Sequence, residues 1–170
     1  GSYPDSLKGG LGDAGAAALR TFVDSGGTVL AFNEASSYAI EALQLPVTNV
    51  LAGVRPSDFY APGSLLRVEL DRSSPLLAGY SAPEPAIWFE GSPAFSVGDS
   101  SRVTVVARYP AAGENPLLSG WLLGAPRLAG RAALVDVRRG RGHVVLFGFR
   151  PQYRAQSMAT YPIIWNALRH

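Results

Sequence analysis

The sequence of 170 residues predicts a single α/β domain with three layers, in which helices cover both faces of a mixed, mostly parallel sheet with an antiparallel extension. A helix, an apolar strand and a second helix fill the first third of the chain, which is typical of a parallel sheet. Alternating and hairpin-like strands occupy the rest. Because a parallel sheet normally needs more than one helix–strand unit, we expect its first strands to lie upstream of residue 1.

The first predicted helix begins at Asp13, whose carboxylate can cap it. Helical spacing relates its apolar positions, which are Ala17, Leu19, Phe22 and Val23. It ends at Gly26-Gly27, since glycine tolerates the left-handed turn that closes a helix. The short apolar run 28–32 follows, bounded by turn residues, and this predicts an interior strand.

A tight turn over 33–36 comes next, and Ser36 or Ser37 is expected to cap a second helix over 38–43. The stretch 45–63 is irregular and contains three prolines, Pro46, Pro56 and Pro62. Later strands are expected over 66–70, 86–89 and 103–109. The segments 132–137 and 143–149 flank a basic Gly-containing turn and predict a hairpin, and a final helix is expected over 155–168.

Composition restricts the function. Charged residues make up 16% and hydrophobic residues 47%, the net charge is +2, and cysteine is absent. Scattered basic residues argue against a nucleic-acid partner, and the cluster Arg138-Arg139-Gly140-Arg141 is expected to be a solvated hairpin tip. Neither a membrane span nor a signal peptide is indicated. Gly1-Ser2 resembles a cloning remnant.

Two segments are expected to end strands beside a shared crevice, where open α/β sheets bind ligands. The first is the strand-to-helix turn of Phe32 to Ser36, where an enzyme would place a nucleophile elbow. The second is the apolar strand end Phe147-Gly148-Phe149-Arg150-Pro151-Gln152. The order of these elements resembles the class I glutamine amidotransferase-like (flavodoxin-like) fold.

That resemblance also indicates what has been lost. Catalytic members carry a Gly-x-Cys-x-Gly elbow and a late Phe-His-Pro-Glu motif, whereas this chain has Phe149-Arg150-Pro151-Gln152 and places Glu34, Ala35 or Ser36 at the elbow. A nucleophile needs a neighbouring base and a group that orients it. Arg150 stays protonated and Gln152 is uncharged, so neither replaces the missing pair. We therefore expect no catalytic residue in this domain.

A further resemblance covers nearly the whole chain. It rests on Gly9-Gly10-Leu11-Gly12, Phe22-Val23-Asp24-Ser25-Gly26-Gly27-Thr28, Leu45-Pro46-Val47-x-Asn49-Val50, Pro62-Gly63-Ser64 and Phe147-Gly148-Phe149-Arg150-Pro151-Gln152-Tyr153-Arg154. Together these resemble the amidotransferase-like C-terminal domain of large bacterial zinc carboxypeptidases of the carboxypeptidase A-like family. The resemblance implies a secreted or periplasmic parent, catalytic zinc in another domain, no cofactor here, and the catalytic domain of the same polypeptide as partner. Self-association is the other partnership left open.

The candidate crevice residues are polar side chains at the two strand ends: Asn33, Glu34, Ser36, Arg150, Gln152, Tyr153 and Arg154. We expect Glu34 to pair with Arg150 or Arg154, since a buried arginine is costly without a partner; the alternative is a general acid or base. The arginines can clamp a carboxylate or anchor an adjoining element.

No metal site is expected, because the two histidines lack a ligand motif: His143 lies within a predicted strand and His170 ends the chain. The function expected is thus a non-catalytic accessory or interaction domain. Two alternatives stay open: a module that binds a carboxylate or a sugar, and a hydrolase that uses Ser36 or Glu34. Trp88, Trp121 and Trp165 are expected to serve packing rather than sugar stacking.

Overall fold

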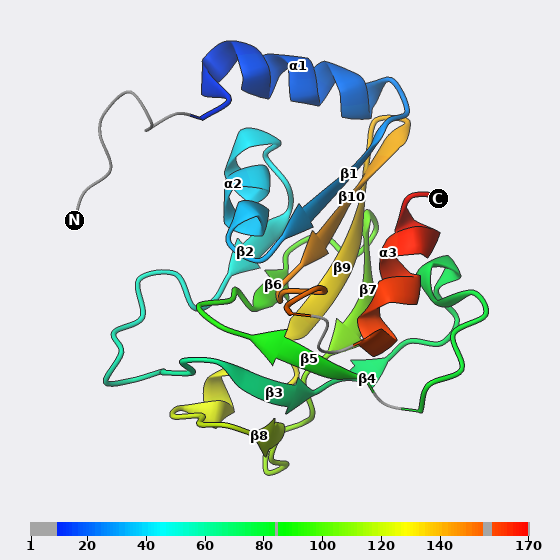
Figure 1. The fold of residues 1–170 in the computed structure, drawn as a ribbon. Coiled ribbons are helices and arrows are strands. Elements are labelled where there is room, and N and C mark those ends of the chain that lie inside the picture. Colours follow the sequence, from blue (N-terminus) through cyan, green and yellow to red (C-terminus); the bar gives the residue numbers. More distant parts are fainter. Residues whose placement is uncertain (1–9, 84, 155–157, 170) are drawn as a thin grey trace.

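The computed structural model describes residues 10–83, 85–154 and 158–169; Gly1-Ser2 and His170 lie outside them. Figure 1 shows the fold. The helices of this part are α1 (Gly12–Asp24), α2 (Ala35–Ala42) and α3 (Tyr161–Ala167), with 3₁₀ turns η2 (Pro75–Leu77), η3 (Ala125–Arg127) and η4 (Met158–Thr160). Its strands are β1 (Thr28–Phe32), β2 (Val47–Asn49), β3 (Ser64–Arg67), β4 (Glu69–Leu70), β5 (Ala86–Phe89), β6 (Phe95–Val97), β7 (Val103–Arg108), β8 (Leu117–Ser119), β9 (Ala132–Arg139) and β10 (Gly142–Phe147). None of these helices is long and apolar enough to cross a bilayer.

The main sheet has seven strands, in the order β1-β10-β9-β6-β2, with β7 on β9 and β4 on β7. Only β1 and β10 run parallel, from Thr28↔His143 to Phe32↔Phe147, and the other pairs among the described strands are antiparallel. The prediction of a mostly parallel sheet is therefore wrong. The cause is the hairpin of β9 and β10: it turns at Gly140, with φ 55°, and brings β9 back antiparallel beside β10.

Each face of the sheet carries its own apolar core, because successive strand side chains point to opposite faces. Val144 and Leu146 of β10 join a cluster with residues of α1 and α2. Val145 and Phe147 join the other cluster, which includes α3 and the separate small sheet β5-β3-β8. Helices thus cover both faces, as predicted, and Figure 1 shows α2 and α3 on opposite sides of the sheet.

The predicted starts of the first two helices are wrong, whereas the first strand and the last hairpin are correct. The helix α1 begins at Gly12, so Asp13 lies in its first turn and does not cap it. The helix α2 begins at Ala35, earlier than expected, and Glu34 occupies the N-cap position without a side-chain cap bond. Both helices begin without a side-chain cap, which is why a rule based on Ser or Asp caps misplaced their starts. The strand β1 and the β9–β10 hairpin are confirmed.

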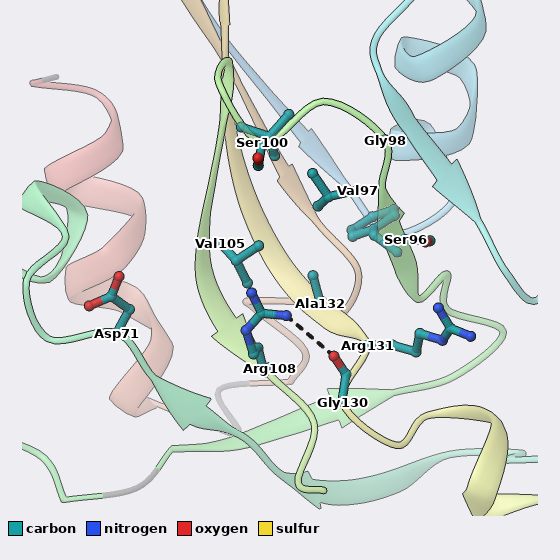
Figure 2. A pocket seen from close by; sticks show the side chains of 12 residues that line it. Asp71, Ser96, Val97, Gly98, Ser100, Val105, Arg108, Gly130, Arg131 and Ala132 are labelled. Atoms are coloured by element: carbon teal, nitrogen blue, oxygen red, sulfur yellow. Dashed lines mark hydrogen bonds between the residues drawn. The ribbon is translucent and has the colours of Figure 1, made fainter.

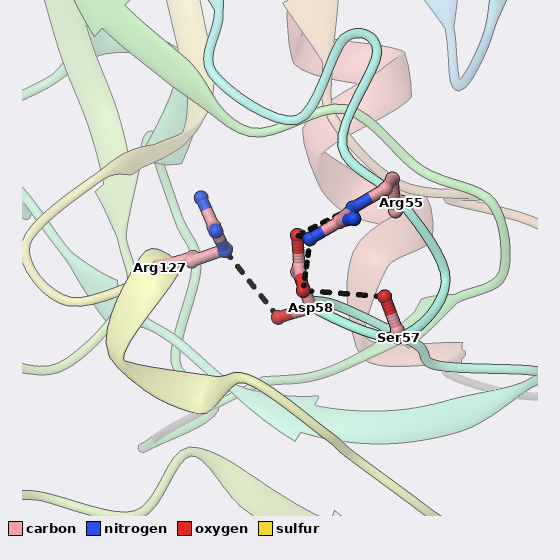
Figure 3. Close-up of polar contacts among 4 residues, drawn as sticks. All are labelled: Arg55, Ser57, Asp58 and Arg127. Atoms are coloured by element: carbon pink, nitrogen blue, oxygen red, sulfur yellow. Dashed lines mark hydrogen bonds and ion pairs between the residues drawn. The ribbon is translucent and has the colours of Figure 1, made fainter.

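The irregular stretch after β2 packs on its own domain. Tyr60 forms an antiparallel bridge with Leu123. Figure 3 shows that Asp58 links this stretch to η3: its carboxylate accepts hydrogen bonds from Arg55, and its carbonyl oxygen accepts one from Nε of Arg127 at 3.3 Å. These contacts fix the stretch beside β5, where it borders the candidate site.

Candidate functional site

The turn from β1 into α2 is a sharp elbow centred on Asn33. Its φ is 52°, a left-handed conformation that costs a non-glycine residue roughly 1 kcal/mol or more. The backbone holds it there, because the Asn33 N–H donates to the Phe147 carbonyl at 2.8 Å and the Asn33 carbonyl accepts from the Ser36 N–H at 3.0 Å. The elbow position expected for Glu34, Ala35 or Ser36 thus belongs to Asn33.

The Asn33 side chain is buried, with only 8% exposure. Its Nδ2 donates to the Glu90 carbonyl at 3.4 Å, but its Oδ1 has no hydrogen-bond partner. A buried acceptor without a partner costs about 1–3 kcal/mol, so a hydrogen bond from a donor that reached this atom, such as a buried water molecule, would stabilise the site.

Ser36 is fully buried in the first turn of α2. Its Oγ lies 2.9 Å from the carbonyl oxygen of Ala31 and 3.1 Å from that of Phe147, and both act as acceptors. The hydroxyl therefore ties α2 to the carboxyl ends of β1 and β10. An Oγ engaged in this way faces no solvent and has no base beside it, which does not favour Ser36 as a nucleophile.

The partner of Arg150 is Glu90, which directly follows β5. Nη1 of Arg150 lies 3.7 Å from Oε2 of Glu90, and Nε1 of Trp88 donates to the same oxygen at 3.2 Å. The Arg150 N–H also donates to the Trp88 carbonyl at 3.1 Å, which fixes the chain after β10 against β5. The predicted pairing of Glu34 with Arg150 or Arg154 is wrong: Arg150 pairs with Glu90 instead, and Arg154 is exposed and forms no ion pair with Glu34 among the described residues.

Tyr153 and the arginines form a layered stack on Trp88. The rings of Trp88 and Tyr153 lie 4.7 Å apart and are parallel within 9°. Both Arg150 and Arg154 place their guanidinium carbon 5.4 Å from the Tyr153 ring centre, within reach of a cation–π attraction. Gln152 is exposed and makes no side-chain hydrogen bond in the described part of the chain.

These contacts define what we call the elbow cluster: Asn33, Glu34, Ser36, Trp88, Glu90, Arg150, Tyr153 and Arg154. A hollow of about 450 Å³ adjoins it across Glu90 and Gly91, lined also by Asn49, Phe59 and Tyr60. Sequence reasoning missed Glu90 and the role of Trp88. The available signal was a carboxylate directly after the predicted strand 86–89 and before glycine.

The elbow cluster offers hydrogen bonds, the carboxylates of Glu34 and Glu90 and the permanent charges of Arg150 and Arg154, and it contains no histidine. His143 is the second residue of β10 and pairs through Nδ1 with Asp136 at 3.0 Å. It lies four strand residues from Phe147, which is roughly 13 Å at about 3.3 Å per residue. Among residues 10–83, 85–154 and 158–169, no three histidine, aspartate or glutamate side chains gather as a metal site would require.

Comparison with known proteins gives structural likeness alone. No protein-family model matches the sequence, and neither does any curated protein. A cytoplasmic protein from Salmonella typhimurium is similar at 15% identity and a TM-score of 0.55 over 96% of this chain and 62% of its own. A β-galactosidase from Bacillus circulans sp. alkalophilus is similar at 15% identity and a TM-score of 0.50, over 91% of this chain and 20% of the β-galactosidase chain. A ThuA-like protein from Bacteroides uniformis is similar at 15% identity and a TM-score of 0.47, over 92% of this chain and 62% of its own.

At such identities the likeness establishes the fold: an α/β domain with a mixed sheet that resembles glutamine amidotransferase-like folds. The chain spans less than two thirds of the length of each of these structures. Its strand-to-helix elbow carries an asparagine.

Proposed function

We propose that this chain is a non-catalytic accessory domain of a larger bacterial zinc carboxypeptidase-like polypeptide, and that it docks through the open edge of β1. The observation that carries the proposal is the strand order. The strand β1 stands at the end of the main sheet, with β10 on one side and no described strand on the other.

The outward backbone groups of β1 follow from its register with β10. The Asn33 N–H donates to the Phe147 carbonyl, and the His143 N–H donates to the Gly27 carbonyl. Alternate residues of a strand face the same neighbour, so the amides of Leu30 and Phe32 face away from β10. The outward groups of Leu30 and Phe32 have no strand partner among the described residues and can serve as a template for a further strand, and we propose that another part of the same polypeptide supplies it.

Exposed apolar side chains flank the same edge. Phe32 is 39% exposed at the end of β1, and Phe22 of α1 is 53% exposed while its ring lies against Gly27 at the start of β1. A sequence of alternating polar and apolar residues would suit an edge strand, but Thr28–Phe32 is nearly all apolar. The composition therefore supports a strand that is covered in the whole protein.

The chemistry of the elbow cluster supports the non-catalytic part of the proposal. An amide at Asn33 is no nucleophile, and Arg150 is a permanent cation that cannot accept a proton. The identity of the parent as a zinc carboxypeptidase, its secreted or periplasmic location, and zinc in its catalytic domain all rest on the resemblance of the short motifs described above. Determining the reading frame upstream of the chain tests that identity directly.

Hydrogen exchange tests the docking edge in the full polypeptide and in this chain alone. We expect the amides of Leu30 and Phe32 to exchange fast in the isolated chain and at least about tenfold more slowly in the full polypeptide, because a new partner strand would protect them. Val29 and Ala31 face β10 and serve as internal controls that stay protected in both. Equal exchange of Leu30 and Phe32 in the two proteins would contradict docking through β1.

Turnover assays test catalytic silence. The isolated chain is expected to hydrolyse no ester or amide in a chromogenic panel above the buffer rate. Hydrolysis that disappears in Asn33→Ala or Arg150→Gln, but persists in the surface variant Arg138→Gln, would overturn that half of the proposal.

A second function, binding of a small ligand at the elbow cluster, is favoured by the unpartnered Oδ1 of Asn33. A thermal-shift screen with amino acids, C-terminal peptides and sugars tests it. A ligand at 100 times its Kd stabilises the protein by about 2.7 kcal/mol, and Asn33→Ala should abolish that shift. If no compound in the panel shifts the melting temperature, the ligand-binding function is excluded and docking is the remaining proposal.

A further inference from the structure

A second hollow, of about 640 Å³, lies on the sheet face beside β6, β7 and β9 (Figure 2). It shares no lining residue with the elbow cluster. Its apolar floor consists of Phe95, Val97, Val103, Val105 and Ala132. These side chains belong to the core cluster of α1 and α2, but Val97 and Val105 are only partly buried. This part of the core is therefore left open to solvent.

Two arginines line one end of the hollow. Arg108 of β7 lies opposite Ala132 in the register of β7 and β9, and Arg131 directly precedes β9, so the two arginines come from neighbouring segments. Figure 2 shows their side chains on either side of Gly130. Arg108 donates from Nη1 to the Gly130 carbonyl at 3.3 Å. Glu69 lies opposite Arg108 in the register of β4 and β7, yet the two form no ion pair.

The charge of the side chains that line the hollow is not balanced. Arg131 is exposed and makes no ion pair or side-chain hydrogen bond within the described residues. The lining includes one carboxylate, Asp71, whose Oδ1 already accepts from the N–H of Ser73 at 3.1 Å and from its hydroxyl at 2.7 Å. The lining thus holds two guanidinium groups and one carboxylate. A single anionic group in the hollow would balance the charge of the lining.

We infer that this hollow binds a small organic carboxylate with an apolar body. The carboxylate contacts Arg108 and Arg131, because guanidinium groups match its geometry and charge. The alkyl or aromatic body covers Val97 and Val105, and the hydroxyls of Ser96 and Ser100 lie at the rim. The volume falls within the roughly 300–1,000 Å³ of ordinary ligand sites. This site is independent of the proposed docking edge.

Calorimetric titration with octanoate tests the inference on the chain as it stands. Acetate retains the charge without the body, and octan-1-ol retains the body without the charge. We expect octanoate to bind at least about tenfold more tightly than either, since loss of a charge-assisted hydrogen bond costs about 1.5–3 kcal/mol. Arg131→Gln should weaken octanoate binding by about tenfold or more, whereas Arg138→Gln, at an exposed arginine of β9 that does not line the hollow, should leave it unchanged.

A free acid and the C-terminal residue of a peptide present the same chemistry. A peptide that ends in leucine, compared with its C-terminal amide, separates the two sources: binding of the acid form alone assigns a peptide end, and binding of neither peptide assigns a free acid. Absence of octanoate binding at millimolar concentration overturns the inference. So does equal binding by the native chain and Arg131→Gln when circular dichroism shows both to be folded.

Discussion

At the scale of single residues, buried polar atoms decide how the elbow is held. The Ser36 hydroxyl joins α2 to two strand ends, and Asn33 carries both the left-handed backbone and an unpartnered Oδ1. One residue thus stabilises the turn that the other strains. That combination is common where a fold presents a binding group.

Replacing Ser36 with alanine tests the structural part of that argument. The variant leaves the carbonyl oxygens of Ala31 and Phe147 without this donor in a buried site, and we expect the free energy of unfolding to fall by about 1–2 kcal/mol. Urea denaturation measures the change. The neighbour Ser37 is only partly buried, so Ser37→Ala is the matched control, with a smaller loss expected. If Ser36→Ala leaves the free energy of unfolding unchanged, the Oγ has no structural role.

Tyr109 gives a prediction about pH. Its phenol is buried without a hydrogen-bond partner, and burial raises its pKa far above the ordinary value. The Tyr109 phenol ionises near pH 10 in the unfolded chain but stays neutral at that pH in the folded chain. Its contribution to the free energy of unfolding is therefore complete below about pH 10 and is lost as the pH rises above it. Tyr109→Phe should lose less stability than the native chain between pH 9 and 11, by urea denaturation. At pH 7 it should gain about 1 kcal/mol, because an unsatisfied hydroxyl leaves the core. Tyr60→Phe, at an exposed position, should change neither quantity.

At the scale of elements, the end of α2 offers a simple gain in stability. Gln44 follows the helix with φ 49°, and the Leu45 N–H donates back to the Ile40 carbonyl at 3.0 Å, the pattern of a glycine-type helix end. Gln44 is exposed, so Gln44→Gly removes no core contact. We expect a gain of about 1 kcal/mol in the free energy of unfolding. Gln44→Ala is the control and should bring no such gain.

The sequence predicts those elements that depend on neighbouring residues, and it does not predict contacts between distant segments. The strand 28–32 and the hairpin 132–147 follow from apolar runs and a glycine turn, and both are present. The parallel character of the sheet could not be predicted, because the partner of β1 is set by a strand more than a hundred residues away. The same holds for the Arg150–Glu90 pair, since only the tertiary fold brings β5 beside the end of β10.

The cluster after β10 was anticipated in part for the same reason. Tyr153 and its two arginines are sequence neighbours, and the structure brings them together. Their platform, Trp88, comes from β5 and was expected only to pack. Gln152, which lies over the glutamate of the amidotransferase motif that the sequence resembles, is exposed outside the cluster. The local sequence therefore indicated that Tyr153 and the two arginines lie together, but not that they pack on Trp88.

At the scale of the whole molecule, α1, α2, α3 and the small sheet cover most of both faces of the main sheet, apart from the hollow beside β6, β7 and β9. At the edge formed by β1, Phe32 is exposed and no described strand pairs with the outward backbone groups. Edge strands are ordinarily short, charged or covered, since free edges promote association. An isolated domain with such an edge is expected to associate with itself when no other strand is supplied.

Sedimentation or light scattering over a range of concentrations tests this expectation. The native chain should form dimers or larger species, and Phe32→Lys should shift it to monomer, because a charge at the end of β1 opposes edge pairing. The substitution also removes the edge-to-face contact with Phe147, at 5.0 Å, so a stability loss of about 0.5–1.5 kcal/mol accompanies it. Leu118→Lys, on the exposed side of β8 in the small sheet, is the matched control and should leave association unchanged. If Leu118→Lys dissolves the association and Phe32→Lys does not, the contact surface lies on the small sheet and β1 is not the docking edge.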